Sequence, residues 1–243
     1  MLLILFFVSI AFSHSWVEQL SVIGRDGLLR GAPGYPRGNV LRTSSEFNDN
    51  AMTYLLPPQS GLDYICAPSQ REPVQTQNSP RLHARRGDQV ILRYQENGHV
   101  TLPWIPPGKP PLSGKIYIYG TTAPTATDLL SSIHKKWNED GSGGNQQGRL
   151  LGTFDFDDGR CFQVNDSPIS RYRRARFGHA PQPPEGNDLW CVNTISIPLD
   201  IESNMLSLYW VWDWPTNLGG IDEKQEIYTT CMDIELSSHQ TCE

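Results

Sequence analysis

The sequence has little of what marks a nucleic-acid binder, a membrane protein or a fibrous protein. Its 243 residues carry 20 Lys and Arg against 26 Asp and Glu, a formal net charge of −6, whereas nucleic-acid binders usually present a basic surface. The longest apolar run, residues 2–12, is shorter than the roughly 20 residues of a membrane-spanning helix. No internal repeat occurs, and a hydrophobic content of 38% is too high for a disordered chain. We therefore expect a globular protein that binds neither nucleic acid nor membrane.

The familiar catalytic signatures are also missing. The chain has no Gly-x-Ser-x-Gly elbow, no His-Glu-x-x-His, no phosphate-binding glycine loop and no dinucleotide fingerprint. Asp157 and Asp158 are neighbours, and neighbouring strand residues point to opposite faces, so they do not predict a carboxylate dyad. These absences exclude the commonest hydrolase, kinase and dehydrogenase classes.

Cysteine is present but never as a Cys-x-x-Cys pair, which excludes a zinc ribbon and a thioredoxin-type redox motif. In an exported protein, five cysteines predict two disulfides and one remaining thiol. The five are Cys66, Cys161, Cys191, Cys231 and Cys242.

The amino-terminal segment predicts export. Residues 2–12 (LLILFFVSIAF) suit the apolar core of a secretory signal peptide, and small residues follow at Ala11 and Ser13. We expect residues 1–13 to be removed and a single secreted, extracellular domain to span 14–243. The alternative is that the apolar run forms a buried amino-terminal strand, but this would leave an exposed apolar flap outside the sandwich.

Elsewhere the pattern is that of strands and turns. Four runs are rich in β-branched and aromatic residues: 89–94, 115–119, 205–212 and 226–236. One amphipathic helix is predicted over 128–137, and the Pro/Gly/Asn-rich segment 33–79 predicts extended loop. The expected fold is mostly β, an antiparallel β-sandwich with long loops and one short helix.

A metal site becomes chemically plausible at the expected cleavage point. Cleavage would give His14 a free α-amino group, which can chelate one ion together with the ring Nδ1. A second imidazole, His99 in Gly98-His99-Val100, would complete a set of three nitrogens. Such a set favours copper. The alternative for His99 is an ordinary surface histidine in a turn.

These anchors resemble the lytic polysaccharide monooxygenases, secreted copper enzymes with a histidine brace on an immunoglobulin/fibronectin-like sandwich. The likeness rests on His14-Ser15-Trp16, on Gly98-His99-Val100 and on the late strand Glu226-Ile227-Tyr228-Thr229-Thr230-Cys231. It implies a monomeric enzyme that uses copper and an external electron donor to cleave polysaccharides oxidatively. It further implies that His14 and His99 bind the copper and that Tyr228 lies axial to it.

The same resemblance implies roles for residues around the late strand. Glu226 stands where the family has a Gln or Glu beside the metal, and Cys231 would form a disulfide with Cys66. The strand period independently puts Glu226 and Tyr228 on one face and Cys231 on the other. The alternative for Tyr228 is a plain core aromatic. The remaining cysteine pairing stays open; we prefer Cys161–Cys191, with Cys242 left free or paired outside the chain.

Other aromatic and charged residues have plainer interpretations. Trp210, Trp212 and Trp214 alternate on one strand face and could stack on sugars, but core packing is the commoner role. Tyr35, in a Pro/Gly loop, is a candidate sugar platform. The basic run 171–176 is typical of a solvated loop and suits contact with an acidic or hydroxylated surface. The remaining histidines are expected to be solvated: His83, His134, His179 and His239.

Two other functions fit the same sequence. One is a secreted copper-binding protein with the same brace and no catalysis, which would bind Cu(II) tightly without oxidising glycans. The other is a noncatalytic β-sandwich that binds carbohydrate or a partner without metal. A secreted protein that does not begin at His14 would exclude both copper functions.

Overall fold

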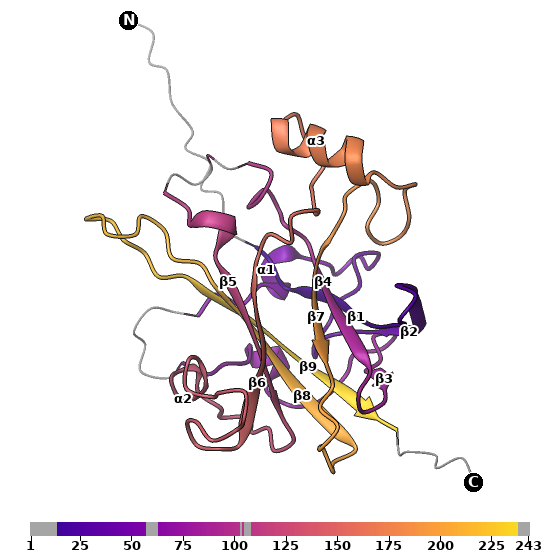
Figure 1. The fold of residues 1–243 in the computed structure, drawn as a ribbon, viewed down its shortest axis with the longest axis vertical. Helices are drawn as coiled ribbons and strands as arrows, with labels where there is room; N and C mark the ends of the chain where they lie inside the picture. Colours follow the sequence, from indigo (N-terminus) through magenta and orange to yellow (C-terminus); the bar gives the residue numbers. More distant parts are fainter. Residues whose placement is uncertain (1–13, 57–62, 103, 105–107, 238–243) are drawn as a thin grey trace, which may run out of the picture.

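Two sheets packed face to face form the body of the protein, as the computed structural model in Figure 1 shows. The structure describes residues 14–56, 63–102, 104 and 108–237. The predicted signal peptide, residues 1–13, therefore lies outside the described residues, as do His239 and Cys242. No helix in the described part of the chain is long and apolar enough to cross a membrane.

The first sheet has four strands in the order β2-β1-β4-β7, and all its pairs are antiparallel. The second has five in the order β3-β9-β8-β5-β6, where only the β3–β9 pair is parallel. The strands are β1 (Val17–Ile23), β2 (Leu29–Gly34), β3 (Leu82–Ala84), β4 (Gln89–Tyr94), β5 (Lys115–Thr121), β6 (Gly148–Asp155), β7 (Cys191–Ser196), β8 (Met205–Asp213) and β9 (Ile227–Leu236). The mostly β, sandwich-like fold predicted from the sequence is confirmed.

The helices differ from the prediction. The helix expected over 128–137 is reduced to α2 (Leu130–Ile133), because the following backbone leaves the helical region and Lys135 takes a positive φ of 57°. The longest helix, α3 (Pro168–Phe177), forms instead where a basic loop was expected. The Ser167 hydroxyl accepts a hydrogen bond from Ser170 N and Pro168 occupies the first turn, which together favour helix initiation.

The described parts of the long segment 33–79, residues 33–56 and 63–79, are mostly loop, as predicted, but contain short helices. These are α1 (Asp49–Met52) and the 3₁₀ helix η1 (Pro68–Gln70); a second 3₁₀ helix, η2 (Pro111–Ser113), precedes β5. In Figure 1, α3 covers one end of the sandwich, and the chain enters β1 from that same end.

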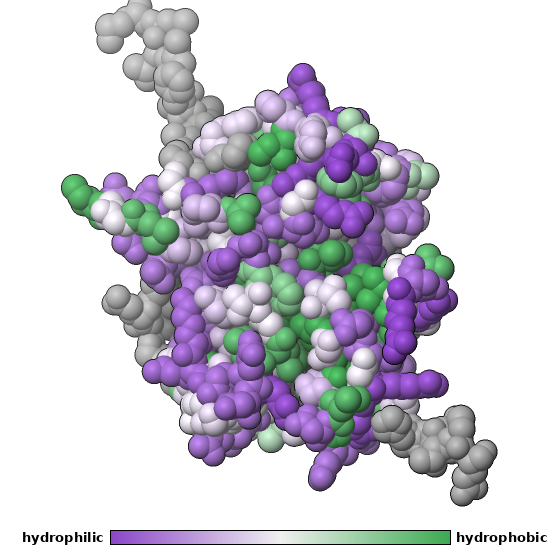
Figure 2. All heavy atoms as spheres, viewed as in Figure 1, coloured by the Kyte–Doolittle hydropathy of each residue, from purple (hydrophilic) through white to green (hydrophobic). Residues whose placement is uncertain are grey.

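Strand β8 is buried on both faces, which explains its density of aromatic residues. Trp210, Trp212 and Trp214 point into the core between the sheets, so the core interpretation of the three tryptophans is confirmed. Tyr209 and Val211 point to the outer face of the five-stranded sheet, where α2 and the loop around Ile65 cover them. The connection from β8 to β9 projects from the body, and apolar side chains, Leu218 and Ile221, are exposed on it (Figures 1 and 2).

Both expected disulfides form in the structure. Cys66–Cys231 ties the long loop to the outer face of β9, and Cys161–Cys191 ties the segment before α3 to the first residue of β7. Two disulfides in one domain fit folding in an oxidising compartment.

A buried ion pair fastens the long loop to the sheet. The Arg37 guanidinium donates to both carboxylate oxygens of Asp233, at 2.9 and 2.6 Å, and also to Ser207 Oγ at 3.0 Å. The two side chains are 1% and 0% exposed. Water cannot reach either side chain there, so removing one of them would leave the charge of the other buried without this partner.

We predict that Arg37→Met lowers the free energy of unfolding by about 3–5 kcal/mol, because it leaves a buried carboxylate without this cation. Urea denaturation monitored by tryptophan fluorescence measures this loss in the free energy of unfolding. Arg30→Met is the control: Arg30 pairs with Asp26 on the surface, where such a pair contributes about 0–1 kcal/mol. Equal losses in the two variants would contradict the prediction.

Candidate metal centre

The residues around His14 are held against the segment that follows β4. Ser15 Oγ donates to the Gln95 carbonyl oxygen at 2.8 Å, and the Asn97 side-chain amide donates to the His14 carbonyl oxygen. These contacts extend the antiparallel pairing of β1 with β4 beyond Val17↔Tyr94. The backbone of His14 is thus fastened to the turn that carries His99.

The His14 ring contacts α1. Its Nε2 lies 2.8 Å from Asn50 Oδ1, and Asn50 N donates to the Asn48 side chain that caps the helix. Because an amide oxygen only accepts, Nε2 donates the hydrogen in this contact. An outer hydrogen bond of this kind is how metal-binding histidines are commonly oriented.

A tight turn after β4 carries His99. Asn97 and Gly98 take positive φ values of 45° and 81°, a conformation that Asn and Gly adopt more readily than other residues. The buried Glu96 carboxylate accepts from Val100 N at 2.7 Å and also from Thr101. The turn is therefore fixed by its own carboxylate.

The His99 ring packs into the core instead of lying on the surface, and only 5% of the residue is exposed. It makes edge contacts with Trp212 and Trp214, at centroid distances of 5.0 and 4.7 Å. Burial, with smaller contributions from the Lys109 and His14 charges, lowers the pKa of His99 to about 3. The ring is thus neutral at ordinary pH.

Tyr228 lies on the other strand that reaches this end. Its ring packs against Trp212 at 5.0 Å, so Trp212 contacts both His99 and Tyr228. Its hydroxyl donates to Glu226 Oε2 at 2.8 Å. Glu226 directly precedes β9 and is partly exposed, with Lys224 Nζ 3.9 Å from its other oxygen. Cys231 lies on the opposite face of β9, as the strand period predicted.

Contacts from β9 connect these groups to the start of β1. Val17 N donates to Thr230 Oγ1 at 3.2 Å, and Thr229 N donates to the Tyr54 carbonyl oxygen at 3.1 Å in the loop that follows α1. His14, His99, Tyr228 and Glu226 therefore belong to segments that meet at one end of the sandwich, although His14 and Tyr228 are 214 positions apart in the chain.

Tyr35 follows β2 and lines a cavity of about 380 Å³ with Arg42 and Trp190. It is half-buried, and its hydroxyl accepts from Gln19 Nε2 at 3.3 Å.

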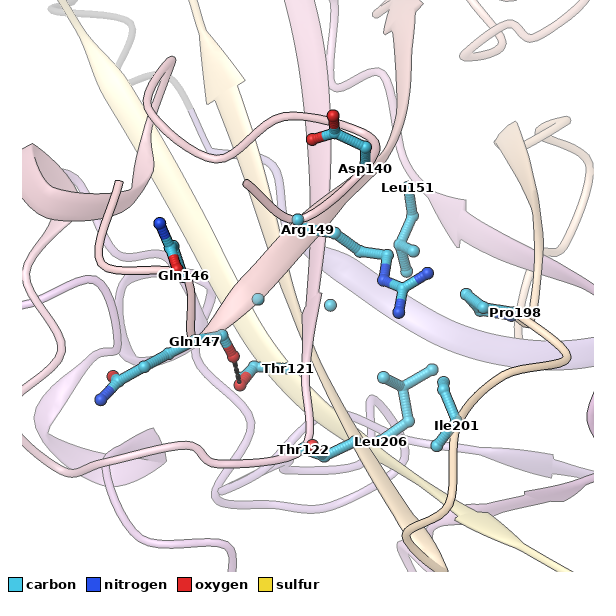
Figure 3. A pocket seen from close by; sticks show the side chains of 13 residues that line it. Thr121, Thr122, Asp140, Gln146, Gln147, Arg149, Leu151, Pro198, Ile201 and Leu206 are labelled. Carbon is cyan, nitrogen blue, oxygen red and sulfur yellow. Dashed lines mark hydrogen bonds between the residues drawn. The ribbon is translucent and has the colours of Figure 1, made fainter. Parts of the chain in front are cut away.

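Two further features contain none of the predicted metal ligands. A cavity of about 290 Å³ lies beside β5 and β6, and Arg149 is part of its lining (Figure 3). Arg149 also pairs with Asp200 at 2.9 Å. Within the described residues, Asp158, Cys161 and Cys191 form a group with metal-like spacing, but the two cysteines are joined in a disulfide and cannot act as thiolate ligands.

Three polar residues were not identified from the sequence. Asn50 and Asn97 position His14, and only the turn-forming Asn97-Gly98 pair carried a signal. His134 was expected to be solvated, and that was wrong: its side chain is 8% exposed, with Tyr119 Oη 3.1 Å from Nδ1 and Asp213 3.6 Å from Nε2. Its partners come from distant strands, so no local pattern could reveal them.

We predict a pH-dependent contribution of His99 to stability in metal-free buffer. Its folded pKa lies below the unfolded value of about 6.5, so the unfolded chain binds the proton first and stability falls as the pH drops from about 6.5 towards 3. Urea denaturation between pH 4 and 6 measures how the free energy of unfolding changes with pH. This change should be about 1.4 kcal/mol per pH unit steeper for the wild type than for His99→Gln. His83→Gln, at an exposed site, should keep the wild-type slope; identical slopes in all three proteins would contradict the prediction.

Comparison with solved structures finds sandwich proteins of low similarity. CvAA9A is 12% identical with a TM-score of 0.42, over 93% of this chain and 80% of that one. A cellulose-active polysaccharide monooxygenase from M. thermophila is 13% identical with a TM-score of 0.38, over 95% and 81%. Cel61B from Hypocrea jecorina, a glycoside hydrolase family 61 member, is 13% identical with a TM-score of 0.36, over 94% and 83%.

Sequence comparison gives a family but no function. No curated protein matches the chain. One family model, described as "Domain of unknown function (DUF7492)", matches residues 11–243. The chain therefore belongs to the DUF7492 family.

Proposed function

We propose that the protein is a secreted, copper-dependent monooxygenase that cleaves polysaccharides by oxidation. Residues 1–13 act as a signal peptide, and the mature domain begins at His14. The α-amino group and Nδ1 of His14, with the His99 imidazole, would hold the copper, and the Tyr228 hydroxyl would face the same site. An external donor supplies the electrons.

The observation that carries this proposal is the attachment of His14 to the His99 turn. The Asn97 amide holds the His14 carbonyl, and Asn97 lies only two residues before His99. One short turn therefore carries one imidazole and fixes the residue that bears the other. A chelating terminus needs this kind of fixation, because the free end of a chain is otherwise poorly ordered.

The donor set fits copper. The contact of His14 Nε2 with Asn50 orients the ring through the nitrogen that the copper would not use, and burial keeps His99 neutral. After cleavage, the α-amino group has an ordinary pKa near 8 and loses its proton at modest cost. Three neutral nitrogens favour copper among the divalent first-row metals. A bound copper ion would supply one-electron redox chemistry towards a C–H bond next to a glycosidic linkage.

The chain's own residues shape the site around that ion. Trp212 and Trp214 pack against His99 and exclude water from the core side. The Tyr228 hydroxyl donates a hydrogen bond to Glu226 Oε2, so this contact does not use the lone pairs of the Tyr228 oxygen. Glu226 is partly exposed beside Lys224, so its carboxylate can exchange a proton with a group arriving from solvent.

We predict that the mature protein beginning at His14 binds Cu(II) through three nitrogens. One extra Gly before His14 should weaken binding by more than about 100-fold, because loss of an outer-shell contact alone costs about 10–100-fold. His99→Ala should have a similar effect, whereas Tyr228→Phe should keep the nitrogen ligands. Calorimetric titration and the nitrogen couplings in the copper EPR spectrum measure this. Unchanged binding in the Gly-extended protein would exclude the brace.

We predict that the copper-loaded mature protein releases oxidised sugars from at least one polysaccharide in the presence of ascorbate, as detected by mass spectrometry. Glu226→Gln should slow release by about 10²-fold or more, as expected for loss of a proton-transfer group, with copper affinity retained. Lys224→Gln, at a side chain that is 72% exposed, is the control and should have little effect. Tight copper binding without oxidised products across neutral and acidic glycans would instead indicate a copper-binding protein without catalysis.

A further inference from the structure

The outer surface of α3 is strongly basic in a chain that is acidic overall. The helix contains four arginines and no acidic residue, against a net charge of −6 for the whole chain. One of the four is structural: Arg173 binds the Asp157 carboxylate through two hydrogen bonds, at 2.7 and 2.8 Å, and also binds the Cys161 carbonyl. The other three, Arg171, Arg174 and Arg176, are exposed.

Little neutralises these three exposed charges. Arg171 lies 3.6 Å from Asp166, but that carboxylate is fully exposed, and such surface pairs are weak. Among the described residues, no carboxylate lies within 4.0 Å of the Arg174 or Arg176 guanidinium. Arg176 lies over the Phe177 ring, 5.5 Å from its centroid, and Arg160 lies over the same ring at 5.2 Å. The basic surface therefore extends beyond the helix to Arg160.

A hollow beside the helix is lined by two of these arginines and by a histidine. Arg171 and Arg174, one helical turn apart, line a depression of about 600 Å³ together with His179 and Asn187. His179 Nδ1 lies 2.8 Å from the Ala180 carbonyl oxygen, and its Nε2 lies 2.8 Å from that of Asp188. Carbonyl oxygens only accept, so both ring nitrogens can donate here only when the ring is protonated, and the two contacts favour that form. The same carbonyl contacts, led by Ala180, raise the pKa of His179.

The segment leading into α3 is joined to the turn that carries His99. Gln163 N donates to Glu96 Oε1 at 2.8 Å, and Asn165 Nδ2 donates to Thr101 Oγ1 at 2.8 Å. Helix α3 covers the end of the sandwich from which the chain enters β1, and hydrophilic side chains gather over it (Figures 1 and 2). A long polymer lying across this end could contact both the α3 surface and the candidate metal centre.

Resting on the function proposed above, we propose that the substrate is an acidic polysaccharide whose uronate carboxylates bind Arg171 and Arg174 on α3. Arginine suits this role because its planar guanidinium matches a carboxylate through two parallel hydrogen bonds. The two positions are about 4.5 Å apart along the helix axis, a spacing that suits repeated binding to successive groups of a polymer. Tyr172, which is 64% exposed between them in sequence, offers an aromatic face to a sugar ring.

Calorimetric titration of the metal-free mature protein with polygalacturonate tests the proposal by measuring the affinity. We expect binding that weakens at high salt and drops by at least about tenfold in Arg171→Glu/Arg174→Glu, because each charge-assisted contact is lost. The control is Arg25→Glu/Arg85→Glu, with the same charge change. These positions follow β1 and β3 and lie at the far end of β1 and β4, where Ile23 pairs with Gln89. The control should bind like the wild type.

The ligand panel separates uronate recognition from simple charge attraction. Fully methyl-esterified polygalacturonate, which lacks the negative charge, should bind at least about tenfold more weakly. Equal binding of the ester, tighter binding of dextran sulfate or duplex DNA, or an unchanged affinity in the α3 variant would each overturn the proposal. Far-ultraviolet circular dichroism of both double variants confirms that they are folded.

Failure of this inference can be told from failure of the proposed function. His99→Ala should bind polygalacturonate like the wild type while losing copper, since the α3 surface does not use the metal. Copper-dependent oxidation of a neutral glycan but not of polygalacturonate would overturn the substrate class alone. Polygalacturonate binding without oxidation of any glycan would overturn the monooxygenase proposal and with it the substrate assignment.

Discussion

Burial of the His99 ring against Trp212 and Trp214 is the constraint on which the candidate site depends. An imidazole on a surface turn would titrate near pH 6.5 and sample several rotamers. In the core it is held neutral and in one place, because protonation would bury a charge. The ring is also polar, so placing it among tryptophans has a cost. Such a cost is more common at a functional position than in ordinary core packing.

Strand β8 joins this constraint to the rest of the fold. Its inward side chains contact His99 and Tyr228, and its outward side chains anchor the loop that Cys66–Cys231 closes. The long loop in turn carries α1, whose Asn50 contacts His14. The three regions that supply the candidate ligands are therefore fixed by one central strand, and a rigid support of this kind suits a preorganised site.

Helix α3 extends the same end of the molecule. It is anchored by Arg173 on its inner side and by the Glu96–Gln163 contact before it, so its outer arginines have a fixed position relative to the His99 turn. The arrangement combines a small site with an extended charged surface. A polymeric ligand needs both, because its reacting bond occupies only a small part of its length.

The sequence alone determined the fold class, the main strands and the faces of β8 and β9, because a strand's period of two fixes which side chains share a face. It also singled out His14, His99, Tyr228 and Glu226 as candidates. It did not show that Asn50 and Asn97 hold His14, that His134 is buried beside Asp213, or that the basic run forms a helix. Those outcomes depend on contacts between residues far apart in the chain. Local patterns record how a segment folds, but only tertiary packing decides which distant groups meet and how much water they keep.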